Sequence, residues 1–80
     1  MSVTNKEYIG EDIVAKYESS NIKEGRYNRV SRKLRVTFNS GASYEYDDVP
    51  HEIFAELNMA DSQGKYFNLN IAKNYTYKKI

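Results

Sequence analysis

Cysteine and tryptophan are absent from this 80-residue chain, and proline and histidine occur once each. Without cysteine, neither a disulfide framework nor a thiolate metal site can form. No apolar run approaches the length of a membrane span, and the N-terminal residues lack the apolar stretch of a signal peptide. We therefore expect a cytoplasmic protein that contacts no membrane.

The same scarcity argues against catalysis and metal binding. His51 is the single histidine, and a role as base or ligand would require a nucleophile or further ligands around it. The sequence has no nucleophile motif, no glycine-rich phosphate loop and no calcium-loop spacing. We expect no enzymatic activity, no cofactor and no metal.

What the chain does contain is tyrosine and segregated charge. Eight tyrosines supply most of the aromatic area, and the formal net charge is only +1. Residues 23–35 hold six basic side chains and one acid, whereas residues 45–61 hold six acids and no Lys or Arg. Blocks of this kind either pair with each other across the fold or present opposed fields to partners.

The central hairpin is the clearest element. Apolar and polar residues alternate over 33–39 and again over 42–47. A two-residue turn at Ser40-Gly41 would place carboxylates on the apolar face, whereas a three-residue turn with a left-handed Gly41 satisfies both faces. We therefore predict the pairs Phe38–Ala42, Val36–Tyr44, Leu34–Tyr46, Arg35–Glu45 and Lys33–Asp47.

The N-terminal part carries weaker signals. Residues 1–18 have little periodicity and are predicted to form an N-terminal arm or short helix, with a strand at the end of this segment as the alternative. A strand is predicted over 20–28. Its apolar residues, Ile22 and Tyr27, are an odd number of positions apart, and a bulge at Gly25 would bring them to one face.

Two helices are expected to cover the tyrosine face of the hairpin. Pro50 opens the first, Ser62 caps the second, and residues 75–80 alternate like a short edge strand. The predicted fold is α+β, with a small antiparallel sheet of three or four strands and two α-helices packed on one face, in a single domain over 19–80. The expected core is Leu34, Val36, Phe38, Tyr44, Tyr46, Ile53, Phe54, Leu57, Phe67 and Ile71.

The order of motifs over about residues 19–80 resembles the KTSC domain family. The stretches that carry the resemblance are SSNI, Tyr27-Asn28, LRVTFNSGASYEYDDVP, ADSQGKYFNLNI and YTYKKI. The family is named after its appearance at the C-terminus of some lysyl-tRNA synthetases, and it also occurs as a stand-alone bacterial or phage protein. The resemblance implies a non-enzymatic binding module associated with RNA. Gly25-Arg26 departs from the family pattern, which usually has an apolar residue followed by glycine.

Basic and aromatic side chains supply the candidate contacts to RNA. Arginines gather beside Tyr27 in the first connection, and lysines alternate with tyrosines in the tail, so that phosphates can be neutralised and bases stacked. In the structural alternative, the first connection is a solvated loop whose basic side chains pair with the acidic block of residues 45–61. The tail is then an edge strand, and its lysines protect it from pairing with other chains. The candidate RNA-binding residues are Arg26, Tyr27, Arg29, Arg32, Tyr77, Lys78 and Lys79.

A protein partner is the alternative to RNA. In that hypothesis the chain is an interaction module, such as a small phage-encoded effector that binds a host protein through an acidic face or a sheet edge. The candidate residues of the acidic face are Asp48, Glu52, Glu56 and Asp61.

Overall fold

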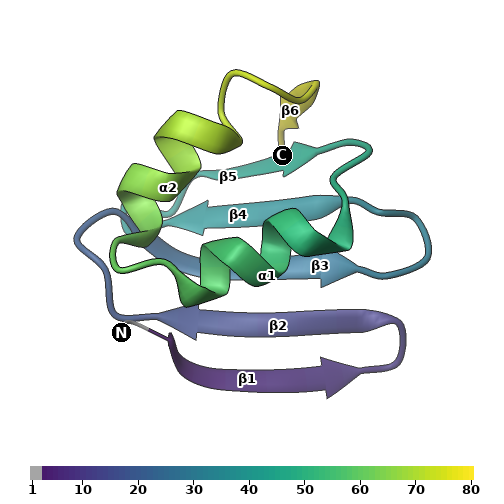
Figure 1. The fold of residues 1–80 in the computed structure, drawn as a ribbon, viewed down its shortest axis with the longest axis horizontal. Helices are drawn as coiled ribbons and strands as arrows, with labels where there is room; N and C mark the ends of the chain where they lie inside the picture. Colours follow the sequence, from purple (N-terminus) through teal and green to yellow (C-terminus); the bar gives the residue numbers. More distant parts are fainter. Residues whose placement is uncertain (1–2) are drawn as a thin grey trace.

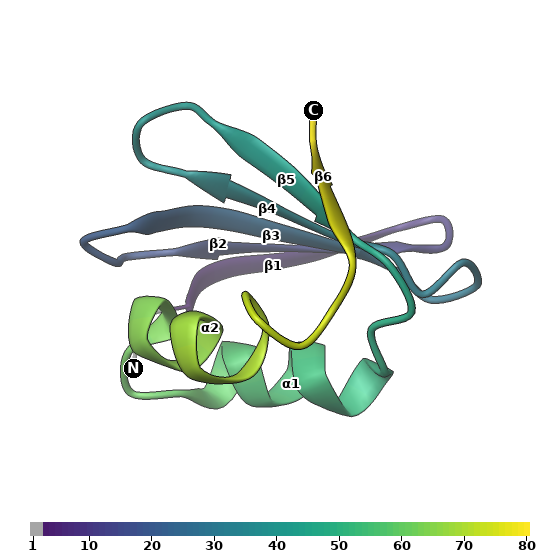
Figure 2. The ribbon, with the colours of Figure 1, turned by 90° about the horizontal axis from the view of Figure 1, so that it is seen from above.

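The computed structural model describes residues 3–80, which form one antiparallel sheet of six strands and two α-helices (Figure 1). Each strand pairs with its neighbour in the sequence, so the order across the sheet is β1-β2-β3-β4-β5-β6. Both helices lie on one face, and the other face is uncovered (Figure 2). The elements are β1 (Val3–Ile9), β2 (Asp12–Tyr17), β3 (Ile22–Asn28), β4 (Leu34–Phe38), β5 (Ser43–Tyr46), α1 (His51–Met59), α2 (Gln63–Asn70) and β6 (Tyr77–Lys79).

The N-terminal segment forms a β-hairpin, so the prediction of an arm or short helix over 1–18 is wrong for its described part, whereas the alternative of a strand at the end of the segment agrees with β2. Residues 1–2 lie outside the described residues. β2 pairs with β3 from Asp12–Asn28 to Lys16–Glu24 and extends the same sheet. The sheet therefore has six strands rather than three or four. β1 gave no periodic signal because it lies at the edge beyond the helices, with every residue after Val3 exposed.

The central hairpin has the predicted register. Its pairs include Leu34–Tyr46, Arg35–Glu45 and Val36–Tyr44. Gly41 has a φ of +97°, and the Phe38 N–H donates to the Ala42 carbonyl at 2.9 Å, as a three-residue turn requires. Lys33 Nζ lies 3.8 Å from a carboxylate oxygen of both Asp47 and Glu45.

A bulge does bring Ile22 and Tyr27 to one face, but it is not at Gly25. The register of β3 shifts between Ile22 and Glu24. Gly25 itself pairs regularly with Val36 and is buried. A Cβ at this position would lie 2.7 Å from the hydroxyl of Tyr17, so the glycine provides room for a side chain from β2.

The core lies between the sheet and the two helices. Of the expected core residues, Leu34, Val36, Tyr46, Phe54, Leu57, Phe67 and Ile71 are buried. Phe38, Tyr44 and Ile53 are partly buried and pack against them. The prediction omitted the core residues contributed by β2, β3 and the β5–α1 connection, which are Ile13, Ala15, Tyr17, Ile22, Tyr27 and Val49.

The connection between the helices depends on two polar side chains. Ser62 is the N-cap of α2, and its hydroxyl accepts from the Lys65 N–H at 3.3 Å, as predicted. Gln63 is fully buried, and its Nε2 donates to the carbonyls of Leu57 at 3.2 Å and Ala60 at 3.1 Å. The side-chain amide thus adds a donor at the C-terminal end of α1, where the Leu57 carbonyl also accepts from the Ala60 N–H at 3.3 Å.

Three tyrosine hydroxyls are held in surroundings that oppose ionisation. Burial raises the pKa of Tyr17, whose hydroxyl donates to Asn58 Oδ1. Burial, with a smaller effect of neighbouring tyrosines, raises the pKa of Tyr46 to about 12. Burial and a hydrogen bond to Glu56 raise the pKa of Tyr66 to about 12.

These shifts predict a loss of stability in alkali. An acid whose pKa is raised by folding keeps its full stabilisation below the unfolded value of about 10 and loses it as the pH rises towards the folded value. Each such group can contribute a slope of up to about 1.4 kcal/mol per pH unit. Urea unfolding above about pH 10 should therefore give a falling free energy of unfolding, and Tyr46→Phe should reduce the slope. An identical slope in that variant would contradict the assignment to Tyr46.

Candidate functional site

Two pockets lie on opposite faces of the sheet. The polar pocket, on the uncovered face, has a volume of about 180 Å³ and is lined by Asp12, Arg26, Asn28, Ser31, Lys33, Arg35 and Glu45. The aromatic pocket, on the helical side near β6, has a volume of about 420 Å³ and is lined by Phe38, Ser40, Ala42, Tyr44, Tyr46, Ala72 and Tyr77.

The aromatic pocket is formed where β6 joins β5. This pairing sets Tyr77 opposite Tyr46 and Lys79 opposite Tyr44. The Tyr77 ring lies 5.4 Å from that of Tyr46 and meets Tyr44 edge-on at 5.8 Å. Tyr77 is 55% exposed, whereas Tyr46 is only 4% exposed. The buried rings therefore support an aromatic surface that remains open to solvent.

The chain around the aromatic pocket is basic. Residues 62–80 contain four lysines and no acid. Lys73 directly follows the pocket residue Ala72, and Lys79 shares the face of Tyr77 because side chains alternate along a strand. Lys78 points to the other face, where its Nζ lies 3.7 Å from Glu45 Oε1. The pocket thus combines open aromatic rings with Lys79 on the same face of β6, and Lys73 follows one of its lining residues in the sequence.

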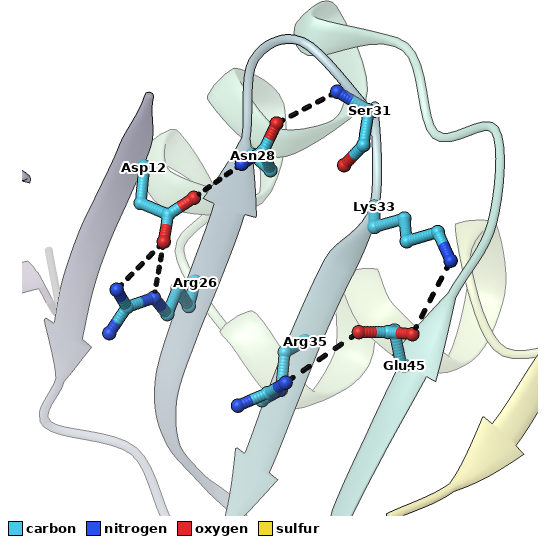
Figure 3. Close-up of a pocket in the computed structure, with 7 residues that line it drawn as sticks. All are labelled: Asp12, Arg26, Asn28, Ser31, Lys33, Arg35 and Glu45. Carbon is cyan, nitrogen blue, oxygen red and sulfur yellow. Dashed lines mark hydrogen bonds and ion pairs between the residues drawn. The ribbon is translucent and has the colours of Figure 1, made fainter. Parts of the chain in front are cut away.

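One side of the polar pocket is tied together by Asp12 (Figure 3). Its carboxylate accepts from Arg26 Nε at 2.7 Å and from Asn28 Nδ2 at 2.8 Å. The hydrogen bond from Arg26 is the main cause of a lowered pKa at Asp12. Asn28 Oδ1 in turn accepts from the Ser31 N–H at 2.7 Å, so the β3–β4 turn is fixed to the same group of side chains.

The other side of the polar pocket is centred on Glu45. Its carboxylate lies 3.7 Å from Arg35 Nη2, 3.8 Å from Lys33 Nζ and 3.7 Å from Lys78 Nζ. These separations exceed the limit of about 3.2 Å for an N–H···O hydrogen bond. One carboxylate therefore forms ion pairs with three cations but lies beyond hydrogen-bond distance of each. The N–H donors of these cations remain available to a further acceptor.

Tyr27 does not lie at a binding surface. It is 1% exposed, its ring stacks on Phe54 at 5.2 Å, and its hydroxyl donates to the Val49 carbonyl at 2.6 Å. The candidate role of Tyr27 in stacking on a base is therefore wrong. The bulge in β3 sets the parity that turns this ring under α1.

The predicted arginines do not form one free patch. Arg26 is paired with Asp12, a neighbour that could not be anticipated without β2. The side chain of Arg29 donates to the carbonyls of Gly10 and Glu11, at the turn between β1 and β2. Arg32 is exposed in the β3–β4 turn, with a φ of +62°. Of the predicted RNA contacts, Tyr77 lines the aromatic pocket with Lys79 on the same face of β6, and Arg26 lines the polar pocket.

The acidic candidates lie along and beside α1. Asp48 precedes the helix, Glu52 and Glu56 are one turn apart within it, and Asp61 follows it. All four are exposed. Glu56 accepts a hydrogen bond from the Tyr66 hydroxyl at 2.7 Å. Asp61 also borders a hollow beside α2.

Two further findings concern residues 3–80. Within this range, no cluster of three or more His, Asp or Glu side chains is arranged to hold a metal ion. Neither described helix has the length and apolar character needed to cross a membrane.

Sequence reasoning missed several residues of the aromatic pocket. The sequence predicts Phe38, Tyr44 and Tyr46 as core residues, it places Ser40 and Ala42 only in the hairpin turn and its register, and it indicates no role for Ala72. The alternation of residues 75–80 predicted an edge strand, but it did not say which strand would be its partner. Pairing with β5 is what places Tyr77 beside the hairpin tyrosines.

Comparisons with known proteins give a consistent result. The model of the KTSC domain matches residues 18–75. A lysine–tRNA ligase of Trichormus variabilis is 38% identical over 73 residues, which are 86% of this chain but 13% of the ligase. An uncharacterized protein of Stutzerimonas stutzeri is 41% identical over 79% of this chain and 90% of its own length. The crystal structure of a KTSC domain protein from Yersinia pestis superposes with a TM-score of 0.81 and 26% identity, covering 86% of this chain and 97% of that one.

Proposed function

Because the chain belongs to the KTSC domain family and is similar to a segment of lysine–tRNA ligases, we propose that it is an RNA-binding module that holds single-stranded RNA at the aromatic pocket. The observation that carries this proposal is the aromatic pocket, in which Tyr44 and Tyr46 on β5 contact the solvent-exposed ring of Tyr77. Proteins that bind single-stranded nucleic acid combine such rings, on which bases stack, with cations that follow the phosphates.

The flanking charges support RNA over an uncharged ligand. Lys79 lies on the face of β6 that carries Tyr77, and Lys73 directly follows the pocket residue Ala72, in a stretch of chain (residues 62–80) that contains no acid. Lysines that contact phosphates release counterions, and binding then weakens as salt is added, with a slope of about −0.7 for each phosphate neutralised on a single strand. With two lysines, the affinity for RNA should fall gently but measurably as salt is added.

The proposal predicts the effect of removing the open ring. Fluorescence anisotropy with a labelled single-stranded RNA should show that Tyr77→Ala weakens binding by about 5- to 150-fold, because stacking contributes about 1–3 kcal/mol per base. Lys73→Gln and Lys79→Gln should each make the salt slope shallower by about 0.7. Circular dichroism of each variant checks that the fold is retained.

Tyr8→Ala is the matched control. Tyr8 is 63% exposed and lies on β1 at the opposite edge of the sheet. Its ring is already covered by cations, with Lys6 Nζ at 5.7 Å and Arg29 Cζ at 5.9 Å from the centroid. Tyr8→Ala should leave affinity unchanged. Equal losses in the two variants, or no loss in a folded Tyr77→Ala variant, would rule out the aromatic pocket as the RNA site.

A further inference from the structure

The uncovered face of the sheet sets two arginines directly opposite each other. Arg26 on β3 pairs with Arg35 on β4, so both side chains leave neighbouring strands on the face of the polar pocket, which they both line. Like charges in this cross-strand position repel each other and destabilise a sheet. The residues around them are therefore expected to supply negative charge.

The carboxylates around the two arginines supply this negative charge unevenly. Asp12 hydrogen-bonds Arg26 and fixes it on one side. Arg35 and Lys33 have only Glu45 and Asp47, at 3.7–3.8 Å, and they share Glu45 with Lys78. Among the residues that line the pocket, three cations face two carboxylates. An excess of one positive charge thus remains where donors lie beyond hydrogen-bond distance of their partners.

The size of the pocket limits what can enter. Its volume is about 180 Å³. That is room for a tetrahedral oxyanion with some of its hydration, and it is less than the roughly 300–1,000 Å³ of pockets that enclose a drug-sized molecule. Ser31, which also lines the pocket, adds a hydroxyl donor at its rim.

From this arrangement we propose that the polar pocket binds a phosphate group, held by Arg35 and Lys33 and bordered by Arg26. A guanidinium group donates two parallel hydrogen bonds to phosphate oxygens, and bonds between two charged groups are about twice as strong as neutral ones. The phosphate offsets the repulsion between the two arginines. This site lies on the face opposite the aromatic pocket, so it does not depend on the proposed RNA function.

The first test uses inorganic phosphate and the whole chain. Titration followed by ¹H–¹⁵N spectra should give saturable shifts at the amides of Ser31, Lys33, Arg35 and Glu45. Sodium chloride at the same ionic strength should not reproduce them. Shifts that are the same with chloride, or that never saturate, would overturn the proposal because they indicate general screening of charge.

Two substitutions at the pocket should act in opposite directions. Arg35→Gln is expected to weaken phosphate binding by about tenfold or more, because it removes a charged donor. Glu45→Gln is expected to tighten binding, because it frees Lys33 and Arg35 from their shared carboxylate. Lys16→Gln, on the same face in β2 but outside the pocket, should change nothing. Weakening by Glu45→Gln in a folded variant would show that the ion pairs are structural only.

A third comparison distinguishes the source of the phosphate from the RNA hypothesis. Ribose 5-phosphate represents a small phosphorylated molecule, and a trinucleotide with and without a 5′-phosphate represents an RNA end. Tighter binding of either phosphorylated probe than of its unphosphorylated form supports the phosphate site and identifies the source of the phosphate. Equal binding within both pairs overturns the proposal. Tyr77→Ala should leave these affinities unchanged, so failure of the RNA proposal can be told apart from failure of this one.

Discussion

Gly25→Ala is expected to lower the free energy of unfolding by about 3 kcal/mol, although alanine forms strands more readily than glycine. The added Cβ would lie 2.7 Å from the Tyr17 hydroxyl and 3.3 Å from both Tyr17 Cε2 and Phe54 Cε1. Tyr17 cannot swing away without loss, because its hydroxyl donates to the buried Asn58. Overpacking and a broken buried hydrogen bond therefore act together.

A double-mutant cycle with Tyr17→Phe tests this cause. Tyr17→Phe alone leaves the acceptor on Asn58 unpaired, which costs about 1–3 kcal/mol. It also removes the atom nearest to the new methyl group. Urea unfolding should therefore show that the double variant is more stable than the sum of the two single changes predicts. Strict additivity would mean that the steric contact with the hydroxyl is not what makes glycine necessary.

Gln63→Glu is expected to destabilise the protein by at least about 3 kcal/mol near pH 7, because it buries an unpaired charge. The Gln63 Nε2 donates to two carbonyl oxygens at 3.1–3.2 Å, and Oε1 has no partner among the described residues. An ionised carboxylate in this place would face those carbonyls with no hydrogen to donate. Its pKa would rise above the ordinary value of about 4.3.

The sign of the pH dependence follows from that shift. An acid whose pKa is raised in the folded state destabilises progressively as the pH rises above its unfolded value. In denaturant titrations, the loss of unfolding free energy caused by Gln63→Glu should therefore be smallest near pH 4 and should grow towards pH 7. Gln63→Met is the control, since it loses the same donors but introduces no charge, and its deficit should not vary with pH. Wild-type stability of Gln63→Glu near neutrality would contradict the burial of this side chain.

The parts of the fold that the sequence predicts are those in which two signals agree. In the central hairpin, the apolar alternation and the cross-strand charge pairs both require the same three-residue turn, and the register is as predicted. β1 and β2 offered no such agreement. β1 has no covered face, and β2 is short, with Val14 buried on the face away from the helices as well as Ile13 and Ala15 beneath them.

Sequence patterns could not place Tyr27 and Arg26 for a related reason. Whether Tyr27 is a surface aromatic or a core residue depends on a bulge at Lys23. Lys23 has no unusual backbone preference, so the sequence does not reveal this bulge. Whether Arg26 is free depends on Asp12, from a strand that the sequence indicated only as the alternative to an arm or helix. The tail residues Tyr77 and Lys79 were identified as candidates, but their pocket exists only because β6 pairs with β5, a long-range contact that local patterns do not specify.

The order of strands has a consequence for how the molecule acquires its aromatic pocket. Strands β1 to β5 follow one another as a meander, so each pairing closes a short loop and can form early. The pairing of β5 with β6 must instead close a loop over residues 47–76, which includes both helices, and the entropy lost in closing a chain segment grows with its length. We therefore expect β6 to be the last strand to add during folding and the first to detach on local unfolding. The tyrosine surface would then be assembled only in chains that have already completed the rest of the domain.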